Sequence, residues 1–174
     1  MKNIKLYIAL ACSLLLAACT GLPEGAQPVK PFELDLYLGK WYEIARLDHS
    51  FERGLNNVTA SYSLMEDGVV KVENRGFDSE KNKWKDAVGK ARPIGDPGEG
   101  RLKVSFFGPF YSGYNIIALD KEYRYALVVG NKTKYLWILS REKSVPAGVR
   151  EDYLRKARTI GCDTTALIWV KHDL

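Results

Sequence analysis

The feature that most constrains the fold is a run of eight short segments with strand character between residues 41 and 140. Apolar and polar residues alternate within these segments, as they do in strands with one buried face. The connections are short, and Glu66-Asp67-Gly68 contains the Asp-Gly pair typical of a tight hairpin. We expect strands at residues 41–48, 58–64, 70–77, 84–91, 102–107, 114–119, 123–129 and 135–140.

Eight strands joined in order by short connections predict an all-β fold in one domain. A sheet with free edges exposes unpaired backbone groups, and closure of the sheet removes those edges. We therefore predict an eight-stranded up-and-down antiparallel β-barrel. The period then changes, because Val149, Tyr153 and Ala157 recur every four residues. This spacing predicts one C-terminal α-helix over Ala147–Thr159, packed on the outside of the barrel, followed by a short strand at 166–170.

The first 18 residues have the composition of a targeting segment. Lys2 and Lys5 precede an apolar stretch at 6–18, which has the length of a signal-sequence core and is too short to span a bilayer. The stretch ends in Leu16-Ala17-Ala18-Cys19, which resembles the bacterial lipobox. That resemblance implies a lipoprotein signal peptide over 1–18 and acylation of Cys19. The alternative is an ordinary signal sequence cut after Ala18.

The residues after Cys19 bear on location and domain boundaries. In lipobox proteins an Asp directly after the cysteine marks retention at the inner membrane, and this chain has Thr20 there. The resemblance thus implies a lipid anchor in the cell outer membrane, on its periplasmic face. Residues 19–31 contain three Pro and two Gly and no apolar period. We expect them to form a lipidated tether ahead of a domain at 32–174.

Charge, cysteine and histidine exclude several function classes. Without Lys2 and Lys5 the net charge falls from +5 to +3, and no basic run is interleaved with aromatics, so no nucleic-acid partner is expected. Loss of the signal peptide and acylation of Cys19 leave Cys162 alone, so no intramolecular disulfide is expected. His49 and His172 have no cysteine or carboxylate at ligand spacing. We therefore expect no metal and no cofactor.

Three motifs occur in the order of the lipocalin signatures. The first is Gly39-Lys40-Trp41-Tyr42 after a short helical turn, the second runs from Ala118 to Leu127 across a hairpin, and the third is Trp137-Ile138-Leu139-Ser140-Arg141. Over about residues 32–170 the chain is similar to the lipocalins, whose barrel forms a calyx. With the lipobox, it resembles the bacterial outer-membrane lipocalins, which are similar to apolipoprotein D.

The resemblance assigns a structural role to two residues. It implies that Trp41 and Arg141 meet at the closed end of the barrel, where the guanidinium lies over the indole. We interpret both as barrel-end structural residues and not as a ligand site.

Alternation along the strands predicts which side chains point into the barrel. If Arg141 points inward, Trp137 and Leu139 do so too. On the first strand, Trp41, Glu43 and Ala45 share one face, and Tyr42, Ile44 and Arg46 share the other. The inward apolar faces of the other strands contribute Val58, Ala60, Tyr62, Val70, Val72, Asn74, Val104 and Phe106.

This lining is apolar with a few polar groups, as small-molecule pockets usually are. The resemblance to the apolipoprotein D branch marks Tyr62, Asn74 and Trp137 as pocket positions. Our candidate ligand-binding residues are Tyr62, Val72, Asn74, Phe106 and Trp137. Asn74 either contacts a ligand or is satisfied by water or backbone, and the aromatic residues either line a pocket or fill the core.

These observations predict a binding protein and not an enzyme. The resemblance implies a fatty acid or a lysophospholipid as ligand, held for storage or transfer of membrane lipid under envelope stress. One alternative is a lipid-modifying enzyme that uses Glu43, the only obvious inward carboxylate. Another is an envelope scaffold without ligand. The resemblance also allows a homodimer, although no stretch assigns an interface. Phe51, Phe110 and Tyr111 are expected at the open rim, where they contact a membrane or cap the barrel.

Overall fold

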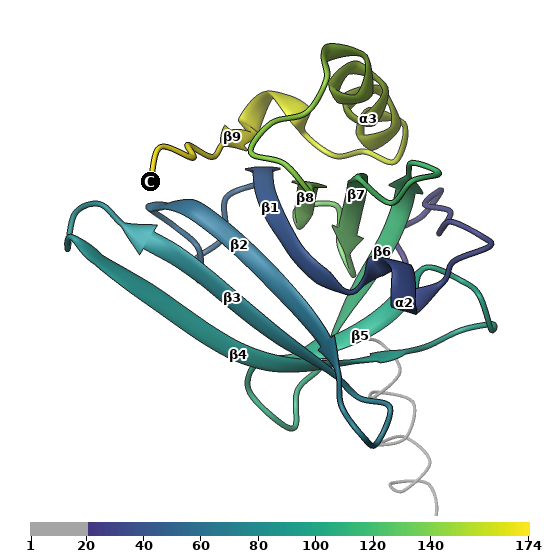
Figure 1. Cartoon of the computed structure of the whole chain (residues 1–174). Helices are drawn as coiled ribbons and strands as arrows, with labels where there is room; N and C mark the ends of the chain where they lie inside the picture. The colour runs from purple at the N-terminus through teal and green to yellow at the C-terminus, as the bar shows by residue number, and fades with distance from the viewer. Residues whose placement is uncertain (1–20) are drawn as a thin grey trace, which may run out of the picture.

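The computed structural model describes residues 21–174. The predictions for the signal peptide and for Cys19 concern residues outside this range. The described strands form one sheet (Figure 1). Their bounds are β1 Gly39–Arg46, β2 Leu55–Leu64, β3 Val70–Asp78, β4 Lys83–Pro93, β5 Arg101–Ser105, β6 Ser112–Leu119, β7 Tyr125–Gly130, β8 Leu136–Ser140 and β9 Ile168–Trp169.

The sheet closes on itself through β1. Strands β2 to β8 follow one another in sequence order, and β1 pairs with both β8 and β2. Every pairing is antiparallel. The predicted eight-stranded up-and-down barrel is therefore confirmed, and the ninth strand is a short addition beside β1. Among the described helices, none has the length and apolar character needed to cross a membrane.

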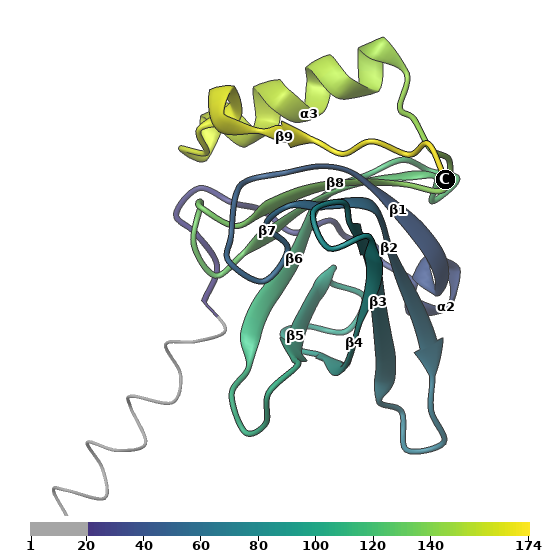
Figure 2. The same ribbon diagram turned by 90° about the vertical axis from the view of Figure 1, so that its left-hand side faces the viewer.

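Helix α3 spans Ala147–Thr159, the predicted range, and lies across the outside of the barrel (Figures 1 and 2). Tyr153 and Ala157 are buried in an outer apolar cluster that also contains Leu127, Ile138 and Cys162. The Tyr153 hydroxyl donates to the carbonyl of Tyr125, 2.9 Å away, and so fixes the helix to β7. After a short 3-10 turn at Thr164–Ala166, β9 returns along β1.

The prediction for the face occupied by two β1 residues is wrong. A bulge lies between Glu43 and Ala45 in the pairing of β1 with β8. A bulge inserts one residue and reverses the facing of the side chains that follow. Ala45 is consequently packed in the outer cluster, while the buried guanidinium of Arg46 hydrogen-bonds to Glu43.

The segment before helix α2 (Leu34–Tyr37) packs against the barrel instead of leading away from it. Leu22 and Ala26 contact the outer cluster. The N–H of Val29 donates to the carbonyl of Ile116, and the N–H of Phe32 donates to the carbonyl of Gly98, both at 2.8 Å. The packed part of the chain thus begins well before the expected start near residue 32. A fragment of residues 20–174 therefore keeps every strand and both apolar clusters that the structure describes.

The closed end of the barrel is sealed by α2 (Leu34–Tyr37) and two side chains from β1 and the end of β8. The Trp41 indole N–H donates to the carbonyl of Tyr37 at 2.8 Å, and the Arg141 guanidinium lies 3.9 Å from the Trp41 ring centroid. The same guanidinium donates to backbone carbonyls of Leu36, Leu38, Lys40 and Tyr123 at 2.9–3.1 Å. One planar fork therefore ties α2, β1 and the β6–β7 turn together.

We predict that Arg141→Lys lowers the free energy of unfolding by about 2 kcal/mol, because an ammonium cannot serve four divergent carbonyls or stack on the indole. Urea unfolding of wild type and variant measures the difference. Arg124→Lys is the matched control, since Arg124 is exposed, pairs with Asp120 and Glu122 and lies over the Tyr125 ring at 5.3 Å, and it should change stability by less than about 0.5 kcal/mol. Equal losses in the two variants would contradict the role of Arg141.

Candidate functional site

The barrel interior collects the candidate ligand-binding residues. Tyr62 and Val72 are buried members of the inner apolar cluster, against which the half-buried Phe106 and Trp137 pack. Asn74 lies on the same face of β3 as Val72, because the pairing of β3 with β4 is regular over that stretch. All five residues are thus on the inner side of the wall, as predicted. Their contact with a ligand stays a prediction.

The interior changes from sealed to open along the strands. At the closed end, Val70 and its partner Ala91 are both 0 % exposed. Further along the same faces, Asn74 and Ala60, which are paired across β2 and β3, are half-buried. Ala87, the β4 partner of Asn74, is exposed. Solvent therefore reaches the inner face of the sheet at the level of Ala87, where β4 has no pairing with β5.

Three tyrosines of the inner apolar cluster join their hydroxyl groups, and we call them the tyrosine floor. The hydroxyls of Tyr37 and Tyr114 are 2.7 Å apart, and those of Tyr114 and Tyr62 are 2.9 Å apart. Burial raises the pKa of all three hydroxyls, so they stay neutral hydrogen-bonding groups. Tyr37 and Tyr114 were not among the candidate residues, because nothing in their local sequence shows that α2 and β6 meet Tyr62.

Asn74 is the polar group on the apolar wall above this floor. Its Oδ1 is buried and has no hydrogen-bond partner among the residues that the structure describes. The backbone alternative for this atom is therefore not realised. On β4, Gly89 is the partner of Val72. It allows Phe106 to lie close to the strand, since a Cβ at Gly89 would be 2.8 Å from the Phe106 ring. The wall thus combines a flat apolar surface with one amide acceptor.

A buried ionic cluster lines the wall beside Trp137. Arg46 Nη1 donates to Glu43 Oε1 at 2.7 Å, and Arg46 Nη2 donates to the carbonyls of Glu52 and Leu55. Trp137 Nε1 donates to Glu52 Oε2 at 3.2 Å. His49 Nε2 lies 2.9 Å from the same oxygen, in an orientation whose angles fall short of a hydrogen bond. Two carboxylates, one guanidinium and one imidazole therefore share a site that water hardly reaches.

The pKa values of the two carboxylates in this cluster are shifted in opposite directions. Burial, and then the neighbouring charge of Glu52, raise the pKa of Glu43 well above its ordinary value. Burial acts the same way on Glu52, but contacts from His49, Trp137 and Arg46 outweigh it, and the pKa of Glu52 is lowered. Burial thus favours the protonated form of Glu43, although its Oε1 accepts from Arg46, and the contacts of Glu52 favour the ionised form of that carboxylate.

Two expectations from the sequence are wrong here. His49 does have a carboxylate neighbour, since Glu52 follows it by three residues in the β1–β2 connection. Glu43 is not the only inward carboxylate, because Glu52 reaches the same cluster. Both errors arise because the connection folds back onto the barrel wall, which alternation along a strand does not describe. Among the described residues, no group of three His, Cys, Asp or Glu is placed to hold a metal ion.

The aromatic residues expected at the open rim differ in exposure. Phe51 is 58 % exposed and stacks on His49, and Phe110 is 77 % exposed. Tyr111 is half-buried beneath Lys103. Phe107, which was expected to end a strand, lies in the β5–β6 connection and is 79 % exposed. The phenyl groups of Phe51, Phe107 and Phe110 therefore project into solvent and do not cap the barrel.

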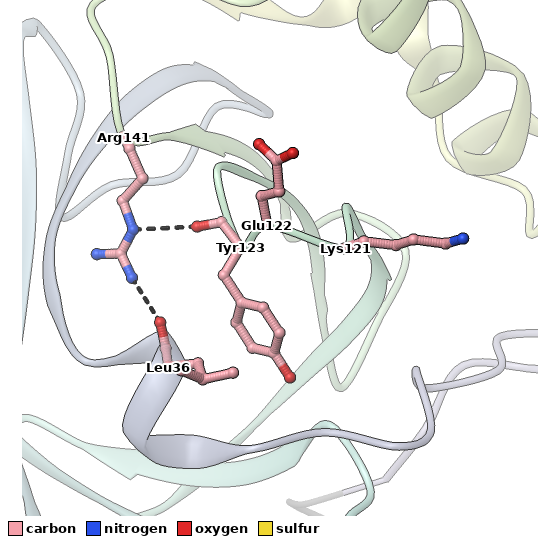
Figure 3. Close-up of a pocket in the computed structure, with 5 residues that line it drawn as sticks. All are labelled: Leu36, Lys121, Glu122, Tyr123 and Arg141. Atoms are coloured by element: carbon pink, nitrogen blue, oxygen red, sulfur yellow. Dashed lines mark hydrogen bonds between the residues drawn. The ribbon is translucent and has the colours of Figure 1, made fainter.

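A shallow pocket of about 340 Å³ lies at the opposite, closed end (Figure 3). It is lined by Leu36, Lys121, Glu122, Tyr123 and Arg141. In Figure 3 the Arg141 guanidinium donates to the carbonyls of Leu36 and Tyr123, so its donors are directed at the backbone. Cys162 is free and buried outside the barrel, and burial raises the pKa of its thiol to about 11. Neither feature belongs to the interior site.

The sequence of this chain is similar to a known family and to named proteins. The family described as "Lipocalin-like domain" matches residues 32–172. The chain is 52 % identical over 163 residues to outer membrane lipoprotein Blc of Vibrio cholerae, covering 93 % of this chain and 95 % of that protein. It is 47 % identical over 173 residues to the protein of that name in Escherichia coli K12, covering 98 % of each.

A solved structure supports the fold alone. Insecticyanin from the tobacco hornworm Manduca sexta superposes with a TM-score of 0.68 at 21 % identity, covering 87 % of this chain and 86 % of that one.

We predict that the raised pKa of Glu43 makes stability depend on pH. The folded protein holds this proton more tightly than the unfolded chain, whose glutamate titrates near 4.5. The resulting stabilisation is complete below that pH and is lost as pH rises through the folded pKa. Glu43→Gln keeps the shape without the titration. Relative to this variant, wild type should lose stability as pH rises above about 4.5, by at most about 1.4 kcal/mol per pH unit.

Urea unfolding of both proteins across that range measures the effect. A constant difference in unfolding free energy from low to high pH would show that Glu43 is ionised throughout.

Proposed function

The chain belongs to the lipocalin family, and on this basis we propose that it binds a single-chain lipid, a fatty acid or a lysophospholipid, inside the barrel. The lipid's acyl chain lies against the apolar inner wall above the tyrosine floor. Its polar end lies toward the open rim, near Asn74 and Trp137.

The observation that carries this proposal is the change in exposure along the inner wall. The barrel is sealed at the level of Val70 and Ala91 and solvent-accessible at the level of Ala87. A cup with an apolar wall and one open end fits a molecule that is apolar at one end and polar at the other. The half-buried Ala60, Asn74 and Trp137 favour this proposal over the scaffold alternative, in which side chains fill the interior.

The wall chemistry also favours binding over catalysis. Glu43 and Arg46 are hydrogen-bonded to each other, and the nearest second carboxylate, Glu52, contacts Trp137 and His49. Each acidic group in the cluster thus already has a protein partner. General acid–base work requires a group within hydrogen-bond reach of the substrate. We therefore propose storage or transfer of membrane lipid under envelope stress, with no chemical step.

The cellular location is part of the same proposal. The V. cholerae and E. coli relatives are named outer membrane lipoproteins, and the segment ending in Cys19 resembles a lipobox. Acylation of Cys19 would fix the barrel to the periplasmic face of the outer membrane. Two or three acyl chains hold a protein on a bilayer far more firmly than one. The protein would then work beside the source of its ligand.

We predict that fatty acids and lysophospholipids change the fluorescence of Trp137 in a saturable way. The test uses residues 20–174, without the acyl anchor, titrated with each lipid in turn. Trp137→Phe should abolish the signal, because Trp41, Trp84 and Trp169 lie away from the open lumen. Affinity should rise up to about fourfold for each added methylene until the acyl chain fills the cup, since each buried CH₂ contributes about 0.8 kcal/mol.

A pair of tryptophan substitutions tests whether the interior is the binding site. Ala60→Trp narrows the cup beside Asn74 and should weaken lipid affinity at least tenfold, on the order of the loss of two buried methylenes. Val88→Trp places the same side chain on the exposed outer face of β4 and should leave affinity unchanged. Lipid affinity unaffected by Ala60→Trp in a folded protein would refute interior binding.

A further inference from the structure

The two ends of the barrel carry opposite charge. In an antiparallel meander, alternate connections lie at the same end. We define the open rim as residues 47–54, 78–85, 106–111 and 131–135, and the closed-end connections as 65–69, 94–100, 120–124 and 141–146. Apart from the buried Glu52, the open rim has six basic and three acidic residues, a net charge of +3. The closed-end connections have four basic and seven acidic residues, a net charge of −3.

Part of the positive charge at the open rim is not neutralised by the protein. Arg53 pairs with Asp48, and Lys81 and Lys85 pair with Asp78. In the part of the chain that the structure describes, no carboxylate lies within 4.0 Å of the ammonium groups of Lys83, Lys132 and Lys134. Among the acidic residues of the rim, Glu80 alone has no basic side chain within that distance. The rim thus presents a surplus of ammonium groups to solvent.

The same rim carries the three most exposed phenyl groups of the described chain. Phe51, Phe107 and Phe110 are 58 %, 79 % and 77 % exposed and come from the β1–β2 and β5–β6 connections. Phenyl groups projecting among lysines are the combination that binds the boundary between lipid head groups and acyl chains. A protein partner would need a continuous surface, whereas this rim is a set of separate loops around a hollow mouth.

We propose that the open rim docks on an anionic phospholipid surface. The phenyl groups of Phe51, Phe107 and Phe110 enter the interface, and Lys132, Lys134 and Lys83 lie at the head groups. The acidic closed end is repelled by the same surface, so the charge distribution orients the barrel with its mouth toward the bilayer. Docking does not depend on Cys19. It deepens the proposed lipid-binding function, because a lipid then passes from bilayer to cup without crossing water.

The experiment is co-flotation of residues 20–174 with vesicles. Vesicles of phosphatidylcholine mixed with phosphatidylglycerol are compared with vesicles of phosphatidylcholine alone. We expect binding to the anionic vesicles only, weakened when the salt concentration rises from about 0.05 to 0.5 M. Lys132→Ala with Lys134→Ala should weaken binding about 25-fold, on the order of fivefold per lysine. Phe107→Ser with Phe110→Ser should weaken it by at least about tenfold.

Matched changes at the closed end separate the rim from the whole surface. Leu64→Ser with Met65→Ser removes two half-exposed apolar side chains there, and Lys121→Ala with Lys143→Ala removes two positive charges. Both should bind vesicles like wild type. Absence of vesicle binding, equal binding to neutral vesicles, or equal losses at the two ends would each overturn the proposal. The change in Trp137 fluorescence on adding lipid is a separate measurement, so failure of docking and failure of interior binding give different results.

Discussion

The barrel depends on the double pairing of β1. This strand hydrogen-bonds to β2 on one side and to β8 and β9 on the other, so without it the sheet would have two long free edges. Its register sets Trp41 opposite Ala60 and, nearer the open end, Arg46 opposite Trp137. The bulge between these points decides which side of the wall receives charge. With regular alternation, the Arg46 guanidinium would lie in the apolar cluster under α3, and the carboxylates inside would lack a counter-charge.

The sequence was sufficient to predict the parts of the fold that repeat a period. Strands β2 to β8 follow one another with short connections, and α3 has the predicted bounds, because periods of 2 and of about 3.6 are both visible in the order of apolar residues. The inner faces of β2 and β3 were also predictable, since both strands are regular from Thr59 and Val70 onward. The bulge in β1 has no local signature, and the faces of Ala45 and Arg46 were therefore misassigned.

The site was predictable only where it is built from strands. Asn74 and Trp137 follow from alternation, whereas His49 and Glu52 lie in a connection, and Tyr37 lies in a four-residue helix. Their positions depend on contacts between segments far apart in the chain, such as the donation from Trp137 to Glu52. The packing of residues 22–32 is of the same kind. A segment rich in proline predicts a tether, but the backbone groups of this one hydrogen-bond to β6 and to the β4–β5 connection.

The two ends of the barrel differ in how completely their side chains are partnered. At the closed end, Arg141, Trp41 and the tyrosine hydroxyls all have partners, which leaves little freedom to move. At the open end, three phenyl groups face solvent and one buried amide oxygen has no partner among the described residues. Glu52 joins the rim to the inner wall, since its own loop carries Phe51 while its carboxylate accepts from Trp137. The same loop is held by the donation from Arg46 to the carbonyl of Glu52, so the position of the rim loop depends on two inner-wall side chains.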